Sequence, residues 1–178
     1  MDNTSNEIKE QLRKVGGADA PEFSLNGKKL YGRVVNVYDG DTITVVLKIF
    51  DNFYKFHVRL SGIDTCEIKS KCEENKKLAI KARNRVLSIV CNKTLEDIEE
   101  RKLDSRKKIN DFLEKEVTIV SVDCQEFDKY GRLLANVYAE NSADHLSSIL
   151  LNERLAYKYG GDTKLTEDQI RDYLGKSC

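Results

Sequence analysis

Three short stretches of the sequence combine acidic side chains with arginines, and these residue types could act on a phosphate. They are Asp39-Gly40-Asp41-Thr42, Arg59 to Glu67 (RLSGIDTCE) and Asp128 to Arg132 (DKYGR). Carboxylates from separate segments suggest a hard divalent cation, which prefers oxygen ligands. Arginines from separate segments suggest a phosphate, because the guanidinium fork matches phosphate geometry and keeps its charge. A metal site beside two arginines is what cleavage of a phosphodiester bond requires, and this is the hypothesis that the sequence raises.

Each stretch has a plainer explanation when it is taken alone. The Asp-Gly pair of the first stretch is a common turn sequence, and DKYGR is typical of a surface turn. Asp41 is less easily explained, since it begins a β-branched strand, where Asp is disfavoured. The acidic residues near Arg59 could form a surface cluster of ion pairs, which contributes little. Even so, Asp64 and Glu67 are far enough apart to serve different partners, one binding a metal and the other acting on a water molecule.

Local patterns predict the elements that must position these side chains. Alternating and β-branched residues, with Asp-Gly and Asp-Asn turns between them, predict a three-stranded meander, and apolar residues at helical spacing predict helices. The expected elements are strands within 28–60, a helix at about 69–91, strands at 117–122 and 132–139, a helix at 144–153 and a terminal helix capped by Thr166 and Gln169. This order predicts an α+β fold, mainly β, in which a five-stranded OB-type Greek-key barrel carries about three or four flanking helices.

Two segments are expected to lie outside this core. Residues 1–24 contain enough apolar residues for one or two amphipathic turns, but a Gly-Gly pair and Pro21 follow, so we expect a mobile tail before a domain at 25–178. Residues 92–115 are dense in alternating charge with few apolar residues, which predicts a solvated helix or helical hairpin. Thr94 and Asp97 have the spacing of a helix N-cap.

Composition excludes several classes of protein. The 178 residues include 30 Lys+Arg and 30 Asp+Glu, so any contact with nucleic acid must come from a local positive cleft and not from a general basic surface. We see no membrane-spanning run, and the charged start is unlike a secretory signal, so we expect an intracellular protein with no membrane partner. The five cysteines show no metal-binding spacing and predict free thiols; with only two histidines besides, a zinc site is not expected.

Longer segments around the three stretches resemble a known family. VYDGDTITV, RLSGIDTCE, DKYGRLLANVY and LLNERLAYKYG are similar to the four signature blocks of the staphylococcal-nuclease-like (thermonuclease) family, over roughly residues 28–160. The resemblance implies an OB-type barrel and a Ca²⁺-dependent enzyme that hydrolyses DNA or RNA, single-stranded or locally unpaired, to products with 3′-phosphates. We expect it to act as a monomer.

The resemblance also implies a role for each matching residue. The expected calcium ligands are the carboxylates of Asp41 and Asp64 and the backbone carbonyl of Thr65. Glu67 matches the glutamate that orients or deprotonates the attacking water, and Arg59 and Arg132 match the arginines that clamp the phosphate. The residues expected to line the nucleotide site are Lys129 and Tyr130, with Tyr157 and Tyr159 near the position of a base-stacking tyrosine.

Two departures from the family pattern bear on this interpretation. Cys66 stands where the family usually has proline, which loosens the loop that holds Asp64 and Glu67 and places a thiol near the site. The charged segment 92–115 looks like an insertion. Two alternatives to an active enzyme remain: a barrel that binds nucleic acid without cleaving it, and a protein-interaction module in which segment 92–115 docks a partner.

Overall fold

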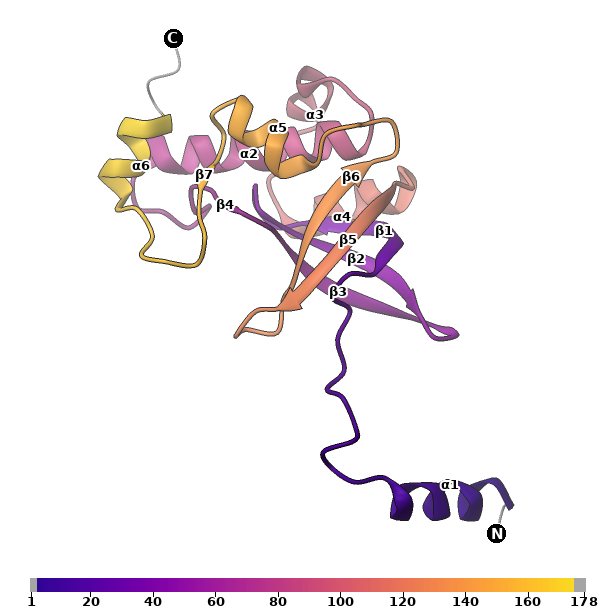
Figure 1. Ribbon diagram of the computed structural model, residues 1–178. Helices are drawn as coiled ribbons and strands as arrows, with labels where there is room; N and C mark the ends of the chain where they lie inside the picture. Colours follow the sequence, from indigo (N-terminus) through magenta and orange to yellow (C-terminus); the bar gives the residue numbers. More distant parts are fainter. Residues whose placement is uncertain (1–2, 175–178) are drawn as a thin grey trace.

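The computed structural model describes residues 3–174 and is built around a closed five-stranded barrel with the strand order β1-β2-β3-β6-β5. The helices lie outside the barrel (Figure 1). The barrel strands are β1 (Lys29–Val37), β2 (Thr42–Ile49), β3 (Asn52–Leu60), β5 (Ile119–Phe127) and β6 (Leu133–Ala139). The α+β, mainly β, barrel predicted from the sequence is therefore confirmed.

The strands form because apolar and polar side chains alternate along them. In β6 the buried positions alternate with half-buried ones, and Leu133, Ala135 and Val137 point into the barrel. Val34 of β1 and Val45 of β2 fill the same interior and are fully buried. Close packing of branched side chains inside the barrel fixes the register of each strand, because a slip of one residue would turn its apolar side outward.

Strand register brings the three acidic and arginine-bearing stretches to one end of the barrel. Thr42 at the start of β2 pairs with Arg59 near the end of β3, so Asp41 lies beside that end. β3 then pairs in parallel with β6, with Val58 opposite Leu133, which places the residue before β6, Arg132, at the same end. Parallel pairing is what closes the barrel, and without it the third stretch would lie far from the other two.

A second, two-stranded sheet continues this end of the molecule. β4 (Ile63–Asp64) pairs antiparallel with β7 (Tyr157–Lys158), and Asp64 lies opposite Tyr157. Gly40, in the turn before β2, lies against α2: a Cβ atom at this position would come within 2.6 Å of Ala82 and 2.9 Å of Thr65. Glycine is therefore required there for the hairpin to approach the helix.

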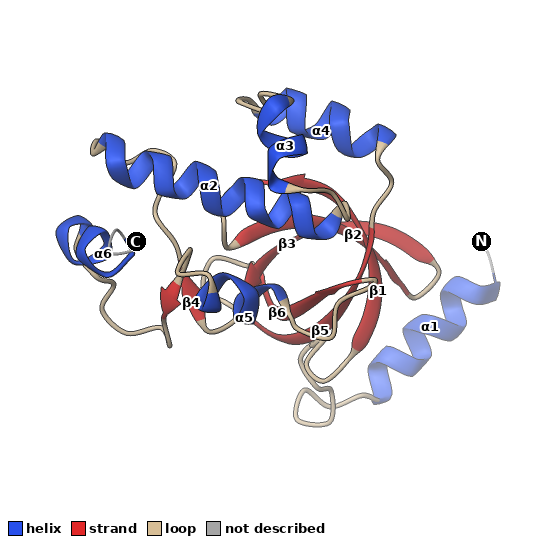
Figure 2. Cartoon of the chain, turned by 90° about the horizontal axis from the view of Figure 1, so that it is seen from above, coloured by secondary structure: helices blue, strands red, loops and turns tan. Residues whose placement is uncertain are grey.

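The described residues form six helices, more than the three or four flanking helices expected. Helix α2 buries one apolar face against the barrel core, and Figure 2 shows it crossing the barrel beside the shorter α5. The charged segment divides into α3 and α4 because Thr94 and Asp97 form a capping box at the first and Ser105 caps the second. The six helices are α1 (Asn3–Lys14), α2 (Glu73–Val90), α3 (Leu95–Glu100), α4 (Arg106–Lys115), α5 (Leu146–Asn152) and α6 (Glu167–Leu174).

The N-terminal segment stands apart from the barrel (Figure 1). Helix α1 has three turns and not the one or two expected, and residues 5–24 are exposed. The mobility of this tail stays a prediction. Of the cysteines, Cys66, Cys72, Cys91 and Cys124 are free, and Cys178 lies outside the described residues. No helix within 3–174 is long and apolar enough to cross a membrane.

Candidate active site

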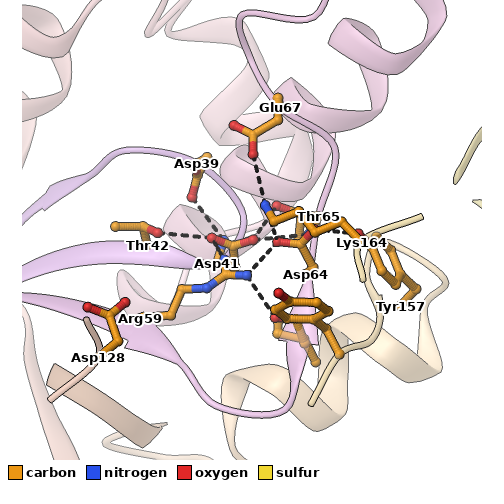
Figure 3. Close-up of polar contacts among 12 residues, drawn as sticks. Asp39, Asp41, Thr42, Arg59, Asp64, Thr65, Glu67, Asp128, Tyr157 and Lys164 are labelled. Atoms are coloured by element: carbon orange, nitrogen blue, oxygen red, sulfur yellow. Dashed lines mark hydrogen bonds and ion pairs between the residues drawn. The ribbon is translucent and has the colours of Figure 1, made fainter. Parts of the chain in front are cut away.

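Arg59 lies between the carboxylates of Asp41 and Asp64 at the end of the barrel (Figure 3). Its Nη1 is paired with Asp41 and its Nη2 with Asp64, and Nη2 also donates to the carbonyl of Ile63 at 3.0 Å. The three charged side chains are at most 7% exposed. Since buried charges are stable only when they are paired, the three side chains act as one electrostatic unit.

The loop after β3 is tied to the first hairpin through Asp41. Both the backbone N–H and the hydroxyl of Thr65 donate to Oδ2 of Asp41 at 3.0 Å, and the hydroxyl of Thr42 donates to Oδ1 at 2.9 Å. These bonds hold the first and second stretches together independently of any ligand.

Asp64 also receives two side chains from the C-terminal part of the chain. The hydroxyl of Tyr157 donates to Oδ2 of Asp64, and Nζ of Lys164 lies 3.1 Å from Oδ1. Lys164 reaches Glu67 as well, at 3.3 Å from Oε1 (Figure 3). Burial alone would lower the pKa of Lys164, but its hydrogen bond to Asp64 and the charges of Asp64 and Glu67 raise it above its ordinary value. Burial and the bond to Asp64 raise the pKa of the Tyr157 phenol, which keeps its proton.

Asp39 belongs to the same acidic group, although its sequence context suggested turn chemistry. It is buried, and its carboxylate accepts the backbone N–H of Asp41 at 3.1 Å. Burial, and next the negative charge of Glu67, raise its pKa to about 6, against the opposing influence of Arg59 and Thr42. The acids at this end of the barrel are therefore only partly neutralised by their neighbours.

The third stretch forms a tight turn that orients Arg132. The carboxylate of Asp128 accepts the backbone N–H groups of Tyr130 and Arg132 at 2.9 Å and the Nε of Arg132 at 2.8 Å. Gly131, with φ of 77°, supplies the left-handed position in the turn. Burial would raise the pKa of Asp128, but these hydrogen bonds and the charge of Arg132 outweigh it and lower the pKa. The guanidinium lies 5.5 Å from the centre of the Tyr130 ring, and its Nη1 has no partner among the described residues.

Two surface hollows meet at the arginines. The first, which we call the acidic hollow, has a volume of about 350 Å³. The residues of the three stretches that line it are Asp39, Asp41, Thr42, Arg59, Glu67 and Arg132, and Lys164 lines it from the loop before α6. The second, the tyrosine hollow, has a volume of about 470 Å³, shares Arg59 and Arg132, and is also lined by Lys129, Tyr130 and Tyr159. A phosphate at the shared arginines would thus have room for a nucleotide beside it.

Three of the residues selected from the sequence line neither hollow. Asp64 and Thr65 lie buried behind Arg59, and Tyr157 is used in the bond to Asp64. Cys66 is also buried and packs in a small apolar cluster that includes Tyr157 and Ala79. Burial, then the charge of Asp64, raises the pKa of the Cys66 thiol to about 12. Its thiol therefore faces a core and not the hollow.

The sequence analysis passed over Asp39 as a site residue and did not select Lys164 at all. An acid at a hairpin turn gives a weak signal, because the sequence does not show that Asp39 is buried beside Asp41. Lys164 lies in a loop almost a hundred residues after Glu67, and nothing in its local sequence separates it from other exposed lysines.

The acids at this end of the barrel supply the oxygen ligands that a hard divalent cation prefers. Among the described residues, Arg59 is paired with Asp41 and Asp64, and Lys164 with Asp64 and Glu67, while Asp39 has no ion pair. Four acids thus share two paired cations, which leaves an excess of negative charge. Among residues 3–174, no three His, Cys, Asp or Glu side chains are grouped to hold a metal. Calcium also accepts backbone carbonyls and water, so two carboxylates and the Thr65 carbonyl fit its preferences. Arg59 and Lys164 now satisfy those carboxylates, and a cation would have to displace one or both.

The fold and the site together define a class of protein. The barrel presents two arginines and a group of carboxylates in adjoining hollows, and these are residue types that can act on a phosphate. The family model for staphylococcal nuclease homologues matches residues 57–175. This match covers more than half of the chain, so the chain belongs to that family, as the sequence blocks predicted. A search of curated proteins found no match.

Proposed function

We propose that this protein is a Ca²⁺-dependent nuclease that hydrolyses the phosphodiester bonds of DNA or RNA. The observation that carries the proposal is that Arg59 and Glu67 of the second stretch and Arg132 of the third line one hollow. The family match supports nuclease-like chemistry in general, and its range contains all three residues. The Asp41 hairpin lies outside that range but is joined to it by the pairing of Thr42 with Arg59.

In this proposal each arginine binds the scissile phosphate. Arg132 is already oriented by Asp128 and keeps one guanidinium nitrogen free to donate. Arg59 is held by Asp41 and Asp64, and it becomes available to the phosphate to the extent that those carboxylates take another cation. Donors aimed at the charge that develops on the phosphoryl oxygens contribute about 3–4 kcal/mol each.

Glu67 is the base that holds a water molecule and accepts its proton. Its side chain is 61% exposed and is restrained by the contact of Oε1 with Lys164, so it is open to solvent beside the buried acids. When bound by Asp41, Asp64 and the Thr65 carbonyl, calcium would act as a Lewis acid that stabilises negative charge on the phosphate. By family resemblance, the 5′-oxygen would leave and the products would carry 3′-phosphates.

A cleavage assay on denatured DNA tests the proposal. The wild type is incubated with Ca²⁺ or with EDTA, beside Glu67→Gln and the matched control Glu100→Gln, which changes an exposed glutamate on α3. We expect cleavage only with Ca²⁺, a loss of at least a hundredfold in kcat for Glu67→Gln, and wild-type rates for the control. A polymerase should extend the products only after phosphatase treatment.

The assay also separates the two alternatives. Calcium-independent cleavage, or full activity in Glu67→Gln, contradicts the mechanism. If the folded wild type binds DNA but never cleaves it, the barrel is a binding module. If it neither binds nor cleaves, an interaction module is the better interpretation.

A further inference from the structure

The inserted helix α4 reaches the acidic hollow with one side chain. Arg106, the first residue of α4, lines this hollow together with Arg59, Glu67 and Arg132. The match to the staphylococcal nuclease homologue family does not by itself assign a role to this segment, and the sequence analysis treated its charges as a solvated face. The N-terminal end of α4, in the middle of this segment, therefore lies in the wall of the proposed active site.

The guanidinium of Arg106 is free to bind a ligand. Within the described part of the chain its side chain has no ion pair or hydrogen bond. The next two residues differ: Lys107 is paired with Asp111 and Lys108 with Asp104, both at 2.9 Å. The two neighbouring lysines are thus paired with nearby carboxylates, one on α4 and one just before it, whereas Arg106 is not.

The acidic hollow that contains Arg106 also has aromatic side chains that suit a nucleotide. Tyr38 and His57 line the hollow on the outer side of the barrel, and both are exposed. The His57 ring is held by Thr44, whose hydroxyl lies 3.2 Å from Nδ1. Aromatic rings beside a free cation are the elements with which proteins bind single strands, because bases stack on the rings and phosphates pair with the cation.

The two hollows share the arginine pair, and this suggests the path of a bound strand. Lys129 and Tyr130 line only the tyrosine hollow, Arg106 lines only the acidic hollow, and the arginine pair lines both. A strand with its scissile phosphate at Arg59 and Arg132 would place one nucleotide in the tyrosine hollow. The nucleotide on the other side of the scissile bond would then enter the Tyr38 and Arg106 region.

We propose that Arg106 binds the phosphate next to the scissile one, on the side away from Lys129 and Tyr130, and so makes the inserted segment a substrate-binding subsite. The ligand is a single-stranded oligonucleotide that extends on both sides of the cleaved bond. This inference rests on the proposed function, because it takes the arginine pair as the position of the scissile phosphate.

Binding and cleavage by Arg106→Ala test the subsite, with Lys107→Ala as the matched control. Fluorescence anisotropy in EDTA measures the affinity for a labelled single-stranded decanucleotide over a range of salt concentrations. We expect Arg106→Ala to bind about tenfold more weakly, as for a lost charged hydrogen bond, and to lower the slope of log K against log salt by about 0.7. Lys107→Ala should match the wild type in both quantities.

Substrate length then distinguishes a subsite from a structural effect. With Ca²⁺, Arg106→Ala should lower kcat/KM on the decanucleotide about tenfold and leave it unchanged on a substrate with a single phosphodiester and no further phosphate. Equal losses on both substrates, or equal behaviour of the two variants, would overturn the subsite. If the wild type binds DNA in an Arg106-dependent manner without cleaving it, the proposed catalysis fails and the subsite stands. If Arg106→Ala cleaves the decanucleotide as fast as the wild type, the proposed catalysis stands and the subsite fails.

Discussion

The two arginines of the proposed clamp should differ sharply in what they contribute to stability. Arg59 is buried between Asp41 and Asp64, whereas Arg132 forms a partly exposed pair with Asp128. Replacing either by alanine should abolish cleavage, so activity alone cannot separate their roles. Measurements of unfolding in the absence of metal can separate these roles.

The expected magnitudes follow from burial. Arg59→Ala leaves two buried carboxylates facing each other, and removing one partner of a buried ion pair costs about 3–5 kcal/mol. For a chain of this length, 1 kcal/mol corresponds to about 2–4 °C, so the Tm should fall by about 6–20 °C. Arg132→Ala breaks a pair near the surface, which costs at most about 1 kcal/mol and lowers the Tm by less than about 4 °C.

Calcium should reverse much of the effect in one variant. In the wild type a bound cation must displace Arg59 from the carboxylates, whereas in Arg59→Ala it competes only with Lys164 at Asp64. At a calcium concentration a hundred times the Kd, binding adds about 2.7 kcal/mol to the free energy of unfolding. We therefore expect the same calcium concentration to raise the Tm of Arg59→Ala more than that of the wild type or of Arg132→Ala.

Urea and thermal unfolding followed by far-UV circular dichroism, in EDTA and in CaCl₂, give these quantities; the chain has no tryptophan for fluorescence. The reasoning is refuted if Arg59→Ala is as stable in EDTA as Arg132→Ala. It is also refuted if calcium stabilises the three proteins equally, since the carboxylates would then not be the place where Arg59 and the cation compete.

Two further predictions concern Lys164 and Cys124. Lys164→Gln removes a cation that lies 3.1 Å from Asp64. Calorimetry should therefore show calcium binding about two- to fivefold tighter than in the wild type, as for loss of a partly exposed ion pair. Weaker binding would mean that Lys164 supports the site and does not compete with calcium. Burial raises the pKa of the Cys124 thiol in the barrel to about 11, so the unfolded chain ionises first as the pH rises above its ordinary value of about 8.5. Between pH 9 and 11 this group should therefore lower the free energy of unfolding by up to about 1.4 kcal/mol per pH unit. The difference in free energy of unfolding between the wild type and Cys124→Ala should shrink across the same range. A constant difference would mean that the pKa of the thiol is the same in the folded and unfolded states.

The barrel could be predicted from the sequence because its signals are local. Alternation along β6, the β-branched run of β2 and the turn before it each act within a few residues, and the pairing of neighbouring strands follows from them. The caps were predictable for the same reason: Thr94 and Asp97 exchange hydrogen bonds, and so do Thr166 and Gln169. Helix number was less predictable, because a charged segment with one thin apolar stripe does not show where it breaks.

The burial of the acids could not be predicted in the same way. The sequence shows that Arg59, Asp41 and Asp64 occur near strand ends, but not that the arginine lies between the carboxylates. The pairing of β2 with β3 places Asp41 beside Arg59, but Asp64 is also covered by Tyr157 through the pairing of β4 with β7, which are separated by many residues along the chain. The roles carried over from the family therefore stay predictions, although the positions of the side chains are now known.

Arg106 shows why residue type alone is a poor guide in a charged segment. Arg106, Lys107 and Lys108 are consecutive cations, and any composition or charge count treats them alike. On a helix, consecutive side chains point to different sides, so only one of the three can face a given neighbour, while residues four apart can pair. Helix α4 uses this geometry: the lysines pair along its surface and the arginine faces the hollow. The docking of α4 on β1, which includes the ion pair of Glu114 with Arg33, selects which of these cations a substrate can meet.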